Sequence, residues 1–295
     1  MSGGDTDTIF TDTFGNAYYQ LMKQDGYYKY RIIYHDTNST FVGYLTESLQ
    51  PLKGVYHTDN KQIEGLWSIG DNQHKPLPNL DAHYIMMFCL NGEDVIYDGK
   101  ISDDMQMHGE GDLYFSSRDI HYRGTWWKDT PSQKPFKIYK DIEHTINFIY
   151  QGQIDECYDL HGHGKQYFVP GHATMSLDTI FYYGKPLQGR EARIQYRNGD
   201  LYRGSINKDG LPHGRGILIR KAHHKKYIGE WKDGLNLSVK YLVHPNILYR
   251  TRLDDEHNER LDGTYQNLSS GTVFASHTVS KMNGLDMLAA VSMEI

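Results

Sequence analysis

The most constraining feature of this sequence is a spacing that occurs three times. A tyrosine is followed by a glycine two residues later and by a His-Gly-x-Gly run that starts eleven residues after the tyrosine. The three copies begin at Tyr97, Tyr150 and Tyr202 and read YDGKISDDMQMHGEGDLYF, YQGQIDECYDLHGHGKQYF and YRGSINKDGLPHGRGILI. A spacing repeated within one chain indicates a repeated structural unit, so the repeat predicts the fold.

Shorter copies of the same pattern occur along most of the chain. They read YRGTW at 122, YYGKPLQGREARIQY at 182, YIGEW at 227 and, more faintly, FVGYL at 41, IEGLW at 63 and LDGTY at 261. Successive starts lie 25 residues apart from Tyr97 to Tyr122 and 20 apart from Tyr182 to Tyr202. One unit is therefore about two strands long.

The glycines of the repeat are expected to make room for aromatic rings. In a strand, Tyr202, Gly204 and Ile206 lie on one face, because alternate side chains point the same way. A ring from the adjacent strand is expected to lie over Gly204, which explains a glycine where strand propensity disfavours it. In the second half of the unit, Gly214 and Gly216 are expected to share a face in the same manner.

Short polar connections join the two halves of each unit. NKDGLP, SDDMQM and DECYDL contain the Asp, Asn, Gly and Pro residues that turns use, so each unit is predicted to be a β-hairpin. Because adjacent hairpins can pair edge to edge, the sequence predicts an all-β, elongated, single-layer antiparallel β-meander. Residues 1–40 are expected to form irregular N-terminal capping strands, 41–265 the repeat array, and 266–295 a short C-terminal cap or helix.

This pattern closely resembles the MORN repeat (membrane occupation and recognition nexus). The matching positions are Tyr97, Gly99, His108, Gly109, Gly111, Tyr150, Gly152, His161, Gly162, Gly164, Tyr202, Gly204, His213, Gly214 and Gly216. The resemblance implies a single-layer β-meander that serves as a scaffold or adaptor, often dimerises, contacts membranes, cytoskeleton or proteins, and has no catalysis in its repeats. The units at 41, 63 and 261 lack the HGxG run, and inserts are expected near 71–92, 128–147 and 169–178.

Composition limits the class of protein. The formal net charge is −6 with a pI near 6.2, so the molecule as a whole has no electrostatic reason to bind nucleic acid. The acidic N-terminus and the presence of only two cysteines favour a reducing, intracellular setting, either cytoplasmic or within a large cytoskeletal, membrane-apposed or viral assembly, and not secretion. The longest apolar run, YIMMFCL at 84–90, is too short for a membrane-spanning helix.

Three local patterns suggest chemistry, and each has a simpler structural explanation. The histidines of HGHG at 161–164 and HH at 223–224 could bind metal, but a histidine that recurs once per repeat is better explained by a hydrogen bond within the hairpin. The HGxG glycines are followed by strand-like residues, which excludes a phosphate-binding loop. The carboxylates and the histidine of LDDEHNER at 253–260 could serve acid–base catalysis, but this segment is expected to be a solvated loop or helix start. No catalytic residue, cofactor or metal is predicted.

Two surfaces remain as candidate contacts for a partner or a lipid. The segment RKAHHKKY at 220–227 concentrates Arg220, Lys221, Lys225 and Lys226 in an otherwise acidic chain. The second surface is an aromatic stripe that includes Tyr122, Trp126 and Trp231, although most of its rings are expected to pack on neighbouring repeats.

The sequence therefore predicts a non-enzymatic scaffold or adaptor that binds other proteins within a larger structural assembly. Irregular repeats and inserts favour this function, because they create individual surfaces and not one repeated lipid contact. The alternative is a peripheral membrane adaptor that binds anionic phospholipids through residues 220–226. The resemblance also allows a homodimer, and an enzyme is the weakest of the hypotheses.

Overall fold

The computed structural model describes residues 8–24, 27–68, 75–142, 145–222, 225–244, 247–253, 263–268, 271 and 273–275. The chain divides into two compact units, residues 1–148 and 149–295. The strands of the first unit are β1 (Thr8–Thr11), β2 (Ala17–Gln24), β3 (Tyr27–Ile33), β4 (Thr40–Leu45), β5 (Pro51–His57), β6 (Lys61–Ser68), β7 (Leu77–Pro78), β8 (Tyr84–Leu90), β9 (Glu93–Ile101), β10 (Met107–Phe115), β11 (Ile120–Trp127), β12 (Thr130–Pro131), β13 (Phe136–Ile142) and the beginning of β14 (Thr145–Ile154).

The rest of β14 belongs to the second unit. The further strands of that unit are β15 (Leu160–Tyr167), β16 (Thr174–Tyr182), β17 (Lys185–Pro186), β18 (Glu191–Tyr196), β19 (Leu201–Ile206), β20 (Pro212–Arg220), β21 (Lys225–Lys232), β22 (Leu235–His244), β23 (Ile247–Thr251), β24 (Thr264–Asn267) and β25 (Val273–Ala275).

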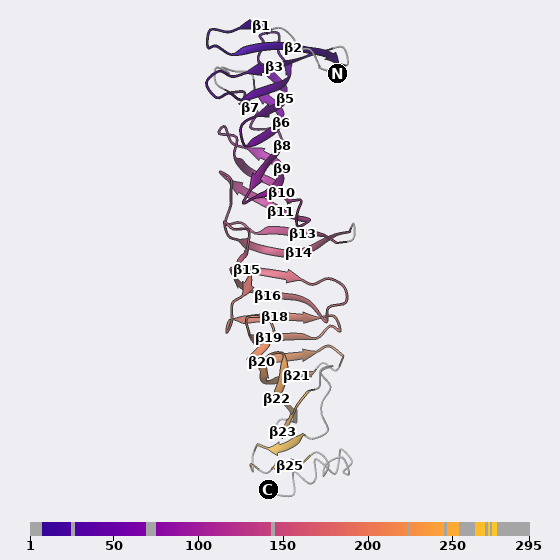
Figure 1. Cartoon of the computed structure of the whole chain (residues 1–295). Coiled ribbons are helices and arrows are strands. Elements are labelled where there is room, and N and C mark those ends of the chain that lie inside the picture. The colour runs from indigo at the N-terminus through magenta and orange to yellow at the C-terminus, as the bar shows by residue number, and fades with distance from the viewer. Residues whose placement is uncertain are drawn as a thin grey trace. The chain divides into compact units, whose positions relative to one another are not determined.

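Within each unit the strands pair antiparallel in chain order, as Figure 1 shows. In the first unit, β8 pairs with β9, β9 with β10 and β10 with β11. In the second, β18 pairs with β19, β19 with β20 and β20 with β21. The two-residue strands β7, β12 and β17 attach to β6, β11 and β16. The prediction of an all-β, single-layer antiparallel meander is therefore confirmed.

One face of each sheet, here called the aromatic face, holds the core. Strand β9 alternates between buried Val95, Tyr97, Gly99 and Ile101 and the more exposed residues between them. Rings on neighbouring strands pack edge to face across this surface; the centroids of Trp126 and Phe136 are 5.2 Å apart. Such pairs contribute about 0.5–1.5 kcal/mol beyond the area they bury. The largest fully buried side chains include Tyr84, Tyr97, Phe115, Trp126, Phe136, Tyr150, Phe181, Tyr202 and Tyr227. The opposite side is called the solvent face.

The turn inside each full repeat has one geometry. Met105, Tyr158 and Gly210 each lie eight residues after the repeat tyrosine, and each adopts positive φ, at 59°, 66° and 76°. The side-chain oxygen of Asp155 accepts hydrogen bonds from the backbone N–H groups two and four residues later, and that of Asn207 does the same. These Asx turns confirm that the polar connections close β-hairpins.

The tyrosine ring covers two glycines, one of them on its own strand. A Cβ added to Gly204 would lie 2.5 Å from the Cα of Gly216 on the paired strand and 2.7 Å from the hydroxyl of Tyr202. Gly204 and Gly216 are direct cross-strand partners, and the ring of Tyr202 lies against both. The expectation that a ring from the adjacent strand covers Gly204 is wrong, because the ring comes from Tyr202 two residues earlier. The same ring covers Gly216 from the adjacent strand, since Tyr202 lies on β19 and Gly216 on β20.

The first glycine of each HGxG run has a different role from the second. Gly109, Gly162 and Gly214 have φ of 69°, 60° and 77°, a left-handed conformation that glycine adopts without steric cost. The register of β19 with β20 shifts beside Gly214, between the pair Gly204–Gly216 and the next pair. The two glycines of the run therefore do not share a face by simple alternation, since a bulge separates them.

The ranges expected to be inserts contain strands of the meander. Strand β8 lies within 71–92, β13 within 128–147, and β16 begins within 169–178. Strands β1, β2 and β3 lie at 8–11, 17–24 and 27–33, where N-terminal strands were expected. The helix expected near the C-terminus falls in 276–295, outside the described residues. The described part of the chain contains no helix, and hence none that could cross a membrane.

Candidate binding surfaces

The three rings singled out as candidate contacts lie in the core. Tyr122, Trp126 and Trp231 are 4%, 1% and 4% exposed. The indole N–H of Trp126 donates to the carbonyl of Gly111 at 3.2 Å, and the ring of Trp231 packs 5.1 Å from that of Tyr202. The structure corrects their assignment as partner contacts, because alternation along the strand turns them to the aromatic face.

The exposed ring in this region is the neighbouring tryptophan. Trp127 is 59% exposed, and its centroid lies 4.7 Å from that of the His108 ring. Strand alternation from the buried Trp126 would have identified Trp127 as the ring on the solvent face.

The basic segment at 220–227 is less of a cationic patch than its sequence indicates. The side chain of Arg220 is 11% exposed, with its Nε 3.7 Å from a carboxylate oxygen of the buried Asp200. The same carboxylate accepts the backbone N–H of Lys221 at 3.0 Å. Lys221 and Lys226 are exposed, while His223, His224 and the side chain of Lys225 lie outside what the structure describes. Arg220 therefore serves local structure more than surface binding.

The three repeat histidines take different partners. His213 Nδ1 lies 3.2 Å from Oδ1 of Asp233, in the turn that follows the next strand, and not within its own hairpin. His161 Nδ1 lies 3.9 Å from Asp155 of its own hairpin turn, and the ring of His108 packs on Trp127. Over the described residues, no three His, Cys, Asp or Glu side chains converge as metal ligands would. The expected hydrogen bond within the hairpin is not the common feature of these histidines.

The first unit carries exposed apolar side chains on its solvent face. Ile85, Met87 and Ile96 are 44%, 37% and 38% exposed, and we call them the apolar patch. Met87 and Ile96 are direct cross-strand partners on β8 and β9, while Ile85 lies two residues from Met87. Acidic residues border the patch, because Ile85 lies opposite Asp98 on one side and opposite Glu64 on the other. Clustered exposed apolar side chains rimmed by polar groups are typical of interaction sites.

The second unit carries a different pattern on its solvent face. Six cross-strand neighbours on β18 to β23 form one line, which we call the cross-strand row: Arg193, Arg203, Ile217, Ile228, Lys240 and Arg250. Two adjacent cations stand at each end, with two isoleucines between them. Ile228 is 48% exposed.

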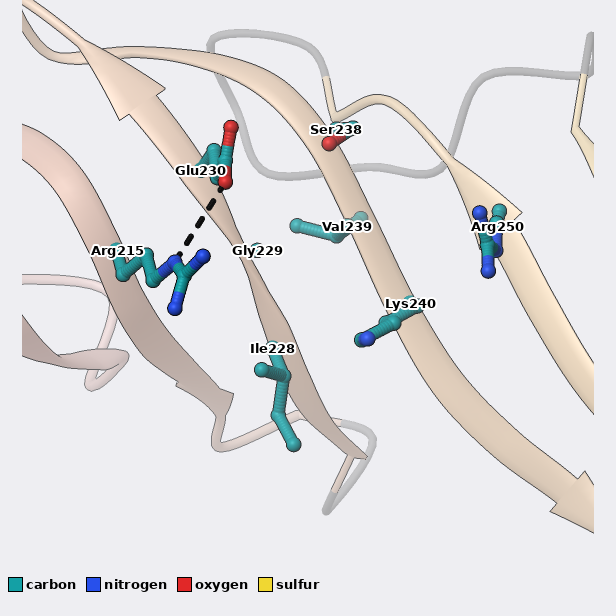
Figure 2. Close-up of a pocket in the computed structure, with 8 residues that line it drawn as sticks. All are labelled: Arg215, Ile228, Gly229, Glu230, Ser238, Val239, Lys240 and Arg250. Carbon is teal, nitrogen blue, oxygen red and sulfur yellow. Dashed lines mark ion pairs between the residues drawn. The ribbon is translucent and has the colours of Figure 1, made fainter.

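A shallow groove of about 430 Å³ lies over the far end of the cross-strand row. Figure 2 shows Lys240 on β22 between Ile228 on β21 and Arg250 on β23. Gly229 has no side chain, so backbone contributes to the floor of the groove. Along one side, Arg215 is paired with Glu230 at 3.7 Å. The groove thus combines an apolar wall with two cations, Lys240 and Arg250, at its other side.

A second hollow of about 340 Å³ lies at the other end of the cross-strand row. Its lining includes Lys165, Asp178 and Arg193, which are cross-strand neighbours on β15, β16 and β18. The hollows therefore occupy both ends of one line of side chains. Sequence reasoning missed this line because its members come from six strands, and only the pairing register brings them together.

These features define the chain as a repeat-built, single-layer β-meander that presents side chains on one open face. Neither the comparison with family models nor that with curated proteins finds a match to this chain.

Proposed function

We propose that this chain is a scaffold that binds other proteins through its solvent face, within a larger structural assembly. The observation that carries the proposal is the apolar patch of Ile85, Met87 and Ile96, where three large apolar side chains cluster in contact with solvent. Burying such a cluster against a partner contributes roughly 25 cal/mol per Å² of apolar area. The resemblance of the repeats to MORN repeats supports the same function.

The geometry of the sheet supports a scaffold in a second respect. The aromatic face is occupied by the protein's own rings, so the side chains of the solvent face are the ones free to meet a partner. That face differs between the two units, with apolar and acidic residues on β6, β8 and β9 and basic and apolar residues on β18 to β23. Different surfaces along one chain suit the binding of different partners.

The membrane-adaptor alternative has less support. Of the four cations on which it depends, Arg220 is paired with the buried Asp200 and only 11% exposed. We therefore retain it as an outcome to be measured and not as a second proposal.

The test compares two triple variants of the full chain in its native setting. One replaces Ile85, Met87 and Ile96 with serine. The other is a matched control that replaces Val169, Leu211 and Leu235 with serine. These three side chains are 42%, 42% and 62% exposed and lie outside the patch. Chemical cross-linking with mass spectrometry is expected to identify protein partners that the patch variant loses and the control keeps. Identical partners and yields in both variants, or no cross-linked protein, would contradict the proposal.

A further inference from the structure

The cross-strand row places like charges directly opposite one another. Arg193 faces Arg203 across β18 and β19, and Lys240 faces Arg250 across β22 and β23. Like charges directly opposite in a sheet destabilise it, so two such pairs on one face oppose the stability of the free protein. A bound anion would offset this repulsion, which gives a reason for two cations to lie opposite each other.

The neighbouring carboxylates only partly neutralise these cations. Glu191 pairs with Arg203, and Asp178 lies opposite Arg193 in the register. At the other end, the side chain of Arg250 donates to Gln266 at 3.2 Å, a neutral partner. Among the described residues, Lys240 has no carboxylate within ion-pair distance. The cationic pair at β22 and β23 is therefore the more available one.

We infer that the cross-strand row and its groove form a docking site for an acidic protein segment with an apolar centre. The inference rests on the proposed scaffold function and specifies one class of partner. Strands lie about 4.7–4.9 Å apart, so the cations Arg203 and Lys240, three strands apart, are separated by about 14 Å. Ile217 and Ile228 fill that interval. A segment with carboxylates at both ends and apolar side chains between them matches this order.

The apolar centre of the cross-strand row, and not its cations, favours a protein segment over other anions. Arginine forms bidentate hydrogen bonds with carboxylates, so Arg250 can hold an Asp or Glu side chain, although its guanidinium pairs with phosphates in the same way. A phospholipid headgroup or a nucleic-acid backbone supplies charge but nothing to cover Ile217 and Ile228 at the centre of the row. The net charge of −6 also opposes the approach of a large polyanion, whereas a short acidic segment meets only the local field.

The test measures binding of a labelled peptide in which glutamates flank a central pair of leucines. The full-length protein is expected to bind it in a fluorescence anisotropy titration, and a peptide with glutamine in place of glutamate is expected to bind much more weakly. Affinity is expected to fall as salt rises, because exposed charges are screened.

The decisive variant is Lys240→Glu, with Lys208→Glu as a matched control. Both change the net charge equally, and Lys208 is an exposed turn residue outside the cross-strand row. Lys240→Glu is expected to weaken peptide binding about tenfold, since it places a carboxylate where the ligand's carboxylate binds. The melting temperature of this variant is expected to stay the same or to rise, because a glutamate at position 240 attracts Arg250 where the lysine repels it. A residue with only a structural role would not separate affinity from stability in this way.

Several results would overturn the inference. Equal affinity of Lys240→Glu and Lys208→Glu for the peptide would do so, as would equal binding of the glutamate and glutamine peptides. Two parallel measurements identify other occupants: flotation with phosphatidylserine-containing vesicles, and light scattering of the protein alone. Vesicle binding, or a dimer, that Lys240→Glu abolishes while the peptide fails to bind would assign the row to a lipid surface or to a second copy. Cross-linked partners that depend on the apolar patch would still support the scaffold function in either case.

Discussion

The ring of Tyr202 lies over Gly204, two residues further along the same strand, and its hydroxyl donates to the carbonyl of Ser205 at 2.8 Å. The equivalent hydroxyls of Tyr97 and Tyr150 donate to the carbonyls three residues later at 2.8 and 2.9 Å. Each ring thus lies flat along its own strand, which is feasible only where a glycine leaves the space empty. The Tyr-x-Gly pattern of the repeat is therefore explained by a tyrosine ring that packs over the glycine two residues later on its own strand.

Replacing Gly204 with valine is expected to destabilise the protein although valine has the higher strand propensity. The new Cβ would collide with the backbone of Gly216 and with the hydroxyl of Tyr202, so the cost should be at least the 1–3 kcal/mol of ordinary overpacking. Ser205→Val is the matched control, because it adds the same branched side chain at the next position of the strand. Thermal unfolding should show a clear loss for Gly204→Val and little change for Ser205→Val. Equal melting temperatures would mean that the Tyr202 ring does not require the glycine.

Gly214 is expected to be required for a different reason, its backbone conformation. Its φ is 77°, and the nearest atom to an added Cβ is 3.8 Å away, so a side chain has room but the wrong backbone geometry. Gly214→Ala should therefore cost about 1–2 kcal/mol, the usual penalty of the left-handed region. Gly214→Asn should cost less, since asparagine tolerates that region better. If denaturant unfolding shows that Gly214→Asn is less stable than Gly214→Ala, backbone strain is not the reason that position 214 requires glycine.

The sequence predicts the fold well because the repeat encodes it locally. Tyr202, Gly204 and the turn of Asn207 to Gly210 lie within nine residues. Their spacing alone therefore predicts the strand, the glycine that leaves room for a ring, and the turn. The source of the ring over Gly204 was predicted wrongly, and the bulge at Gly214 was not predicted. Strand alternation says which face a residue occupies, but not which way a ring lies on that face or where a residue with positive φ interrupts the alternation.

The binding surfaces are harder to predict, because they depend on the register between strands. Arg203 and Ile228 occupy the variable position between the repeat tyrosine and glycine, and Ile217 follows the second glycine of HGRG. All three lie on the solvent face, so the variable positions of the repeat do carry a signal for that surface. Lys240 and Arg250 lie in irregular strands without the signature, and no spacing in the sequence places them beside Ile228. Only the pairing of β21, β22 and β23 does so.

The buried tyrosines predict a loss of stability at alkaline pH. Burial raises the pKa of Tyr84 from 10.0 to about 12, although a hydrogen bond with Asn79 opposes the shift, and burial also raises the pKa of Tyr97 and Tyr150. The folded state therefore keeps these phenols neutral at pH values where the unfolded state ionises them. Their stabilising contribution is complete below about pH 10 and is lost as pH rises towards 12 and beyond.

A titration of tyrosinate absorbance alongside circular dichroism checks this expectation. Part of the tyrosinate signal should appear together with the loss of strand signal. Tyr84→Phe removes one of the titrating groups, so its stability should fall less steeply between pH 10 and 12 than that of the wild type. Complete ionisation of the tyrosines without any change in circular dichroism would contradict the expectation that their ionisation unfolds the protein.

Asp200, and not the exposed Lys226 of the basic segment, is expected to matter for stability. Its carboxylate is 1% exposed, lies 3.7 Å from the guanidinium of Arg220, and accepts the backbone N–H of Lys221. Asp200→Ala leaves the largely buried Arg220 without this counter-charge and one backbone donor without its acceptor. Breaking a buried pair on one side typically costs about 3–5 kcal/mol.

Lys226→Ser serves as the comparison, because Lys226 is exposed and surface charges contribute about 0–1 kcal/mol. Denaturant unfolding should show a large loss for Asp200→Ala and almost none for Lys226→Ser. The same two variants separate structure from membrane binding in a flotation assay with anionic vesicles. If Lys226→Ser abolishes vesicle capture at unchanged stability, the exposed part of the segment binds lipid. If neither the wild type nor the variant is captured, the cations at 220–226 do not bind anionic lipid.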